Sequence, residues 1–146
     1  MNAKERLDHL IQNEYSYAVY RENDFIFSDT GRGIAPLYKL YLRSENWQGC
    51  TLVDRAVGTG AAYLCVLMGF SEVDALLISK GAHELLHAHN IKTYSNQKPD
   101  YILNRAKNGL CPLENKFLTD QFHTPPLEVI ESFLQEMANN AAEKQK

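Results

Sequence analysis

Residues 51–69 read TLVDRAVGTGAAYLCVLMG, a short apolar run, two charges and then a segment that is apolar on nearly all sides. The run Thr51–Val53 predicts a buried strand, and the segment that ends at Gly69 predicts a buried helix, because neither has a polar face for solvent. A strand and a helix of this kind belong at the centre of an α/β sheet. Asp54 and Arg55 stand between them, so we expect both at a strand-to-helix turn beside a cleft.

Shorter segments with helical or strand-like periodicity flank this centre on both sides. Because strands and helices alternate, the pattern predicts an α/β fold with a mixed sheet and helices on both faces, in which an N-terminal hairpin is the antiparallel part. Residues 101–105 fit either a strand or a helix. The other expected elements are a helix at 2–13, a hairpin of 17–20 and 25–27, a helix beginning near Pro36, a strand at 75–78, a helix at 81–89, a strand at 91–94, a short helix from Cys111 and a last helix from Pro125.

The composition is that of an ordinary globular chain, with 146 residues of which 45% are hydrophobic and 23% charged. This length suffices to bury one core, so we expect a single domain over residues 1–146. Within it, residues 1–14 would form an N-terminal helix. Residues 125–146 would form a C-terminal helix with a frayed tail, because large apolar side chains are missing from its end.

Charge, hydropathy and cysteine content exclude several classes of function. The net charge of −3 offers no basic face, so we expect neither nucleic acid nor a membrane as a partner. The longest apolar run, around residues 61–70, is much shorter than the roughly 20 residues of a bilayer span. The start MNAKERLDHL has no signal-peptide core, and three widely spaced cysteines favour reduced thiols. We therefore expect a cytoplasmic protein.

The segment His83-Glu84-Leu85-Leu86-His87 matches the His-Glu-x-x-His pattern of zinc hydrolases. A catalytic zinc needs a third protein ligand, and no recognisable one follows in the sequence. Helical periodicity also turns Leu85 and Leu86 inward and leaves the polar side chains toward solvent. A solvated helix face explains the pattern better, so zinc hydrolysis is a remote alternative, and we expect neither a metal nor a cofactor.

Two glycine-containing turns offer candidate anion sites. Gly58-Thr59-Gly60 follows the central strand and begins a helix, whose free N–H groups and positive dipole end can bind phosphate. The turn lacks the third glycine of a dinucleotide fingerprint, so close packing of the helix on the sheet is the competing interpretation. In Gly31-Arg32-Gly33, the arginine offers a planar fork of donors for phosphate or carboxylate, or else is a solvated turn residue.

A further polar cluster comprises Asn104-Arg105 and the segment Gly109–Glu114. Cys111 lies there at the start of an expected helix, where the pKa of a thiol can fall and make it nucleophilic. The competing interpretation is a buried, inert thiol, since free cysteine is usually part of a core. We assign Cys50 and Cys65 to the core for the same reason.

Three motifs in this order and spacing resemble one family of bacterial proteins, a domain of unknown function placed in the cytidine deaminase-like superfamily. The motifs are Gly31–Leu37, Asp54–Gly58, and Asn104-Arg105 with Gly109–Glu114, and the resemblance covers residues 15–119. It implies a three-layer α/β/α cytidine deaminase-like domain with a mixed sheet of about five strands. Because superfamily members commonly handle nucleobases or nucleotides, it also implies a nucleotide-type ligand, and because they often self-associate, a homodimer.

The chain departs from true deaminases at the metal ligands. Zinc deaminases carry His-x-Glu or Cys-x-Glu at the start of one core helix and Pro-Cys-x-x-Cys at the start of the next. By element order these positions fall at Asp54-Arg55-Ala56 and at Lys80–Leu85, where Ala82 and Leu85 stand in place of the cysteines. Alanine and leucine cannot bind zinc. The resemblance therefore implies a zinc-less domain whose site would be at Asp54 and Arg55.

Three hypotheses about function follow from these residues. The first is a module that binds a small anionic or nucleotide-type ligand at Asp54 and Arg55. The second is an enzyme in which Cys111 is the nucleophile and Asp54 or Glu114 transfers a proton. The third is an interaction protein with a vestigial pocket. The candidate ligand-binding residues are Arg32, Arg55, Thr59, Asn104 and Arg105.

Overall fold

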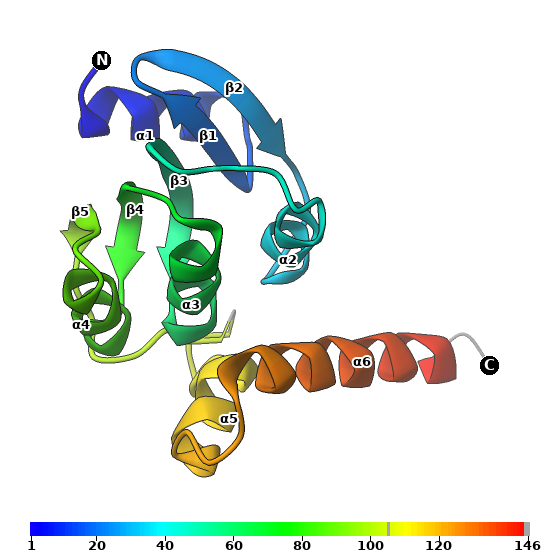
Figure 1. Cartoon of the computed structure of the whole chain (residues 1–146). Helices are drawn as coiled ribbons and strands as arrows, with labels where there is room; N and C mark the ends of the chain where they lie inside the picture. Colours follow the sequence, from blue (N-terminus) through cyan, green and yellow to red (C-terminus); the bar gives the residue numbers. More distant parts are fainter. Residues whose placement is uncertain (105, 145–146) are drawn as a thin grey trace.

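The computed structural model describes residues 1–104 and 106–144, which form a five-stranded mixed sheet with helices on both faces (Figure 1). In the strand order β2-β1-β3-β4-β5, β1 pairs antiparallel with its two neighbours, and β3, β4 and β5 pair in parallel. This confirms the predicted α/β class and agrees with a three-layer α/β/α arrangement. The elements are α1 (Ala3–Gln12), β1 (Tyr17–Arg21), β2 (Asp24–Asp29), α2 (Ala35–Leu42), β3 (Cys50–Val57), α3 (Thr59–Met68), β4 (Glu72–Ile78), α4 (Lys80–Ala88), β5 (Lys92–Gln97), α5 (Pro112–Asp120) and α6 (Pro126–Lys144).

The central strand β3 is longer than its apolar run. Asp54 pairs with Ala75 of β4, and the parallel ladder continues as far as Val57 and Ile78. The prediction that Asp54 and Arg55 lie at a strand-to-helix turn is therefore wrong. Backbone hydrogen bonds to β4 extend the strand regardless of side-chain polarity, and the turn itself is at Gly58.

The helix α3 is the centre of the fold, as its sequence predicts. Leu64 and Cys65 are fully buried within the larger core cluster, which contains residues of β3, β4, α2, α4, α5 and α6. Gly69 ends the helix in the left-handed conformation with φ of 82°, which glycine adopts at no steric cost. At the next helix, the Ser79 hydroxyl accepts a hydrogen bond from the Ala82 N–H, so the predicted cap of α4 is confirmed.

The opposite face of the sheet is covered by α1. Arg6 on this helix donates through Nε to Asp74 at 2.8 Å and through Nη2 to Glu72 at 2.6 Å, and Asp74 is fully buried. Desolvation, followed by the hydrogen bond with Glu72, raises the pKa of Asp74 to about 7, and the hydrogen bond with Arg6 opposes the shift. These buried ion pairs anchor α1 to β4.

The C-terminal elements lie beyond the carboxyl ends of β3 and β4 (Figure 1). The tail predicted to fray continues α6 as far as Lys144, in a segment rich in the good helix formers alanine, glutamate and lysine. Before α5, Leu103 forms an isolated antiparallel bridge with Leu110, so residues 101–104 belong to neither a helix nor a named strand. Within the described ranges, no helix combines the length and the hydropathy that crossing a bilayer requires.

Candidate functional site

A cavity of about 240 Å³ lies where β3 and β4 give way to α3 and α4, with α5 as its third wall. This is the carboxyl edge of the parallel strands, where open α/β sheets bind ligands. Of the predicted site residues, Thr59 and Glu114 line the cavity together. The other polar residues of its lining are Ser79, Glu84 and Asp100, and Gly81 also belongs to the lining.

The apolar part of the lining comes from α4, from α5 and from the segments that adjoin them. Phe117 is 3% exposed, whereas Phe122 is 62% exposed. The centroids of the two rings are 5.9 Å apart, and their planes are inclined by 37°. The backbone at Phe122 is left-handed with φ of 61°, one residue after α5 ends at the left-handed Gln121. The remaining apolar lining residues are Leu85, Tyr101 and Leu118.

Glu114 joins α5 to the start of α3. Its Oε1 accepts a hydrogen bond from the Thr59 N–H at 2.6 Å, and its Oε2 accepts a longer one from the Ile102 N–H at 3.5 Å. The side chain is only 5% exposed. The N-terminus of a helix carries unpaired N–H groups and a partial positive charge, so this carboxylate takes the place that we considered for a phosphate.

Gly58 and Gly60 allow α5 to pack closely against α3. A Cβ on Gly58 would lie 2.6 Å from Glu114 Oε1, and one on Gly60 would lie 2.7 Å from Leu113 Cδ2. Both distances are shorter than real Cβ contacts, so a side chain at either position would displace the side chain of Glu114 or of Leu113 on α5. The geometry favours the packing interpretation of this turn, but the neighbours that lie close to the two glycines belong to α5 and to Ile102, not to the sheet.

Asp54 points from β3 into the α3 side of the sheet, outside the cavity lining. Its Oδ1 accepts a hydrogen bond from the Arg55 N–H at 2.7 Å, and its charge influences the titration of Tyr17 and Cys65. Desolvation raises the pKa of Asp54 to about 7, against the opposing effect of the backbone N–H groups of Arg55 and Ala56. A carboxyl with this pKa can exchange a proton near neutral pH.

Arg55 leaves β3 in the direction opposite to Asp54, because successive side chains of a strand point to opposite faces. Its Nε donates to the carbonyl oxygen of Tyr15 at 2.9 Å, just before β1. Asp54 and Arg55 are therefore hydrogen-bonded through the Arg55 backbone N–H, which donates to the Asp54 side chain. The Arg55 guanidinium does not line the cavity. The expectation of a cleft formed at both side chains gains no support from this arrangement.

Arg32, Asn104 and Cys111 do not line the cavity. Arg32 is exposed in the loop before α2. Asn104 stabilises a local turn, since its Oδ1 accepts from the Asn108 N–H at 3.2 Å and its Nδ2 donates to Asn108 Oδ1 at 2.9 Å. Cys111 is half-buried at the N-cap of α5 and packs against the larger core cluster. Arg105 lies outside the described residues.

The His83–His87 pair lies on α4 as the motif predicts, with ring centroids 6.1 Å apart and nearly parallel planes. Burial lowers the pKa of His83, and the charge of Lys98 acts in the same direction. Within residues 1–104 and 106–144, no group of three histidine, cysteine, aspartate or glutamate side chains is arranged to hold a metal ion. The pair therefore has no third protein ligand among these residues. Leu86 is buried and Leu85 partly buried, as the periodicity predicts.

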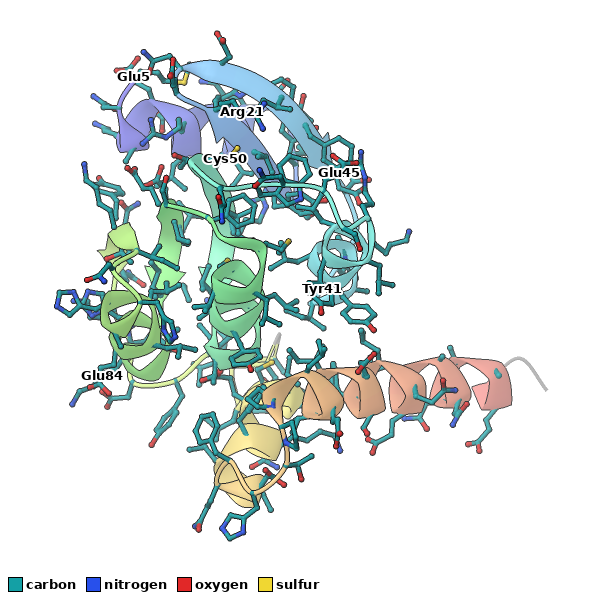
Figure 2. The ribbon with its side chains drawn as sticks, viewed as in Figure 1. Glu5, Arg21, Tyr41, Glu45, Cys50 and Glu84 are labelled. Atoms are coloured by element: carbon teal, nitrogen blue, oxygen red, sulfur yellow. The ribbon has the colours of Figure 1, made fainter. Side chains whose placement is uncertain are left out.

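Sequence reasoning missed the residues that complete the cavity, namely Asp100, Tyr101, Leu118 and Phe122. Glu84 was noticed only as part of the His-Glu-x-x-His pattern, and Figure 2 shows it on α4 at the edge of the molecule. The available signals were Pro99 before Asp100, and Phe117 and Phe122 toward the C-terminal end of α5. Nothing in their spacing indicated that the loop after β5 and the end of α5 meet.

Two comparisons with known proteins agree with one another. Residues 6–134 match the family described as TM1506, domain of unknown function (DUF1893). The fold is similar to the crystal structure of a DUF1893 family protein (TM1506) from Thermotoga maritima, with a TM-score of 0.77, 25% sequence identity, and coverage of 91% of this chain and 88% of that one. No curated protein matches the chain. Because the family match spans most of its length, this chain belongs to the DUF1893 family.

Proposed function

We propose that this chain is a binding domain for a small planar organic ligand, which occupies the cavity between α3, α4 and α5. One observation carries the proposal: aromatic rings and polar groups from three separate elements converge on a single hollow at the carboxyl edge of β3 and β4. Apolar pockets with a few convergent polar groups are the usual form of small-molecule sites. Their placement at this edge is the rule for α/β sheets.

The dimensions of the cavity limit the ligand. Its volume of about 240 Å³ is below the roughly 300–1,000 Å³ of typical sites for drug-sized molecules, so one ring system is a suitable occupant. Phe117 forms part of the buried wall and Phe122 part of the exposed rim. A planar ring stacked on Phe122 would bury its apolar face against this wall and leave its edge for Thr59.

The lining of the cavity suits the nucleobase of a nucleotide-type ligand better than the phosphate. A nucleobase matches the aromatic walls in size and shape. A phosphate matches them less well, because none of the residues known to line the cavity is a lysine or an arginine. The proposal also includes membership of the cytidine deaminase-like superfamily, with which the mixed five-stranded sheet is consistent. It includes, in addition, a cytoplasmic location and a homodimer.

Binding can be measured by ligand-detected NMR and by thermal shift, with adenine, cytosine, their nucleosides and their nucleoside monophosphates as the panel. We expect at least one planar compound to bind and its affinity to fall about tenfold or more in Phe122→Ala, which removes an exposed stacking ring. Met137→Ala is the matched control, because Met137 is 52% exposed on α6 and does not line the cavity. Absence of binding by every compound of this panel and by the benzyl compounds introduced below would overturn the proposal.

A further inference from the structure

All the charged residues known to line the cavity are acidic. Glu84, Asp100 and Glu114 contribute carboxylates, and no lysine, arginine or histidine stands among the lining residues of the described chain. Glu84 and Asp100 are exposed, and neither forms an ion pair with any described residue. The hollow therefore presents acceptors and negative charge to whatever enters it.

Glu114 is the buried member of this set. It is only 5% exposed, and within residues 1–104 and 106–144 no cationic side chain forms an ion pair with it. The start of α3 supplies the Thr59 N–H at 2.6 Å and a partial charge of roughly +0.5. That partial charge offsets only part of a full negative charge. Buried carboxylates are usually paired, and the described residues give Glu114 no full counter-charge, so it adds to the negative potential of the cavity.

Aromatic rings complete the environment that recognises an organic cation. Tyr101, Phe117 and Phe122 line the same hollow as the carboxylates, and two of these rings are in contact at 5.9 Å between centroids. The face of an aromatic ring attracts a cation through its quadrupole, and this attraction strengthens as water is excluded. Carboxylates and rings together therefore favour an ammonium group.

We infer that the ligand of this cavity is a small organic cation, a planar ring that carries a protonated amine. The inference rests on the proposed function and names the chemical class of its ligand. The ring stacks on the exposed Phe122, beside Phe117, and the ammonium group lies toward the carboxylates of Glu84 and Asp100. An anionic ligand of the same size would instead bring its charge toward three carboxylates, which repel it.

Three compounds of nearly equal shape test the sign of the charge: benzylamine, benzyl alcohol and benzoate. At neutral pH and low salt, we expect benzylamine to bind at least tenfold more tightly than benzyl alcohol, and benzoate to bind most weakly. The double variant Glu84→Gln with Asp100→Asn should reduce the preference for benzylamine to less than about threefold. Both changed residues are exposed, so the fold should tolerate the substitutions.

Asp8→Asn is the matched control, since Asp8 is an exposed carboxylate on α1, which packs on the other face of the sheet. Its benzylamine affinity should equal that of the unchanged chain. Benzoate binding as tightly as benzylamine would overturn the inference, as would a preference that survives the double variant. If nucleobases bind and none of the three benzyl compounds does, this inference fails while the proposed function stands. If no compound of either panel binds, both fail.

Discussion

Glu114 Oε1 lies 2.6 Å from the backbone nitrogen of Thr59, so a side chain of α5 closes the N-terminus of α3. The two residues are 55 positions apart in the chain. Their hydrogen bond satisfies a donor that the helix itself leaves free, and it fixes one wall of the cavity. The stability of this region should therefore depend on the carboxylate.

Replacement of Glu114 by alanine should destabilise the fold by about 1–3 kcal/mol, because the change leaves the partly buried Thr59 N–H without its acceptor. The free energy of unfolding from urea denaturation measures this loss. Asn115→Ala is the control, since Asn115 is an exposed neighbour on the same helix and should change stability little. Equal effects of the two substitutions would show that Glu114 does not stabilise α3.

Replacement by alanine should destabilise the fold at Gly58 but not at Gly81. At Gly58 the new Cβ would meet Glu114 Oε1 at 2.6 Å and Ile102 Cγ1 at 3.0 Å, so Gly58→Ala should cost about 1–3 kcal/mol. At Gly81 the nearest atom is Thr59 Oγ1 at 3.8 Å, and alanine is the better helix former, so Gly81→Ala should be neutral or stabilising by up to about 1 kcal/mol. Thermal unfolding of both variants measures the contrast, and a stable Gly58→Ala chain contradicts it.

The raised pKa of Asp54, about 7 in the folded chain against 3.8 as its ordinary value, predicts a dependence of stability on pH. Between these values the folded state holds a proton that the unfolded state has lost, so the free energy of unfolding should fall as the pH rises from about 4 to 7. Asp54→Asn removes this titration. As the pH rises from about 4 to 7, the variant should therefore become more stable relative to the unchanged chain.

Urea denaturation at several pH values measures that difference. Comparing the two chains cancels the titration of histidines and of Asp74, which both share. Glu22→Gln serves as a control, because it changes an exposed carboxylate in the turn between β1 and β2. A difference between Asp54→Asn and the unchanged chain that stays constant from pH 4 to 8 is incompatible with a raised pKa.

The three cysteines should differ in their accessibility to a thiol reagent. Cys111 is half-buried, whereas Cys50 and Cys65 are fully buried, and burial raises the pKa of the Cys65 thiol well above its usual range. In the native chain, dithionitrobenzoate should modify one thiol first, and Cys111→Ser should abolish that fast phase. A reactivity of Cys111 no greater than that of the buried thiols would also count against the hypothesis that it is a nucleophile.

Local sequence patterns determined the elements of this fold. Alternating apolar runs and helical spacing predicted the order of strands and helices, because each pattern reflects which faces of a segment are buried. Ser79 and Gly69 marked a helix start and a helix end correctly, since capping depends on the conformational preferences and hydrogen bonds of neighbouring residues. The packing interpretation of Gly58 and Gly60 was also available from the sequence, although the partner that they admit was not.

Only the tertiary structure decided where the site lies. Strand β3 continues through Asp54 because β4 pairs with it, and the next side chain then points away, which separates the two residues that were expected to share a cleft. Glu114 reaches α3 because the chain returns after β5. Contacts of this kind join residues far apart in sequence and leave no local periodicity. The sequence by itself therefore determined the layers of the protein, and the packing of α5 against α3 and α4 decided its cavity.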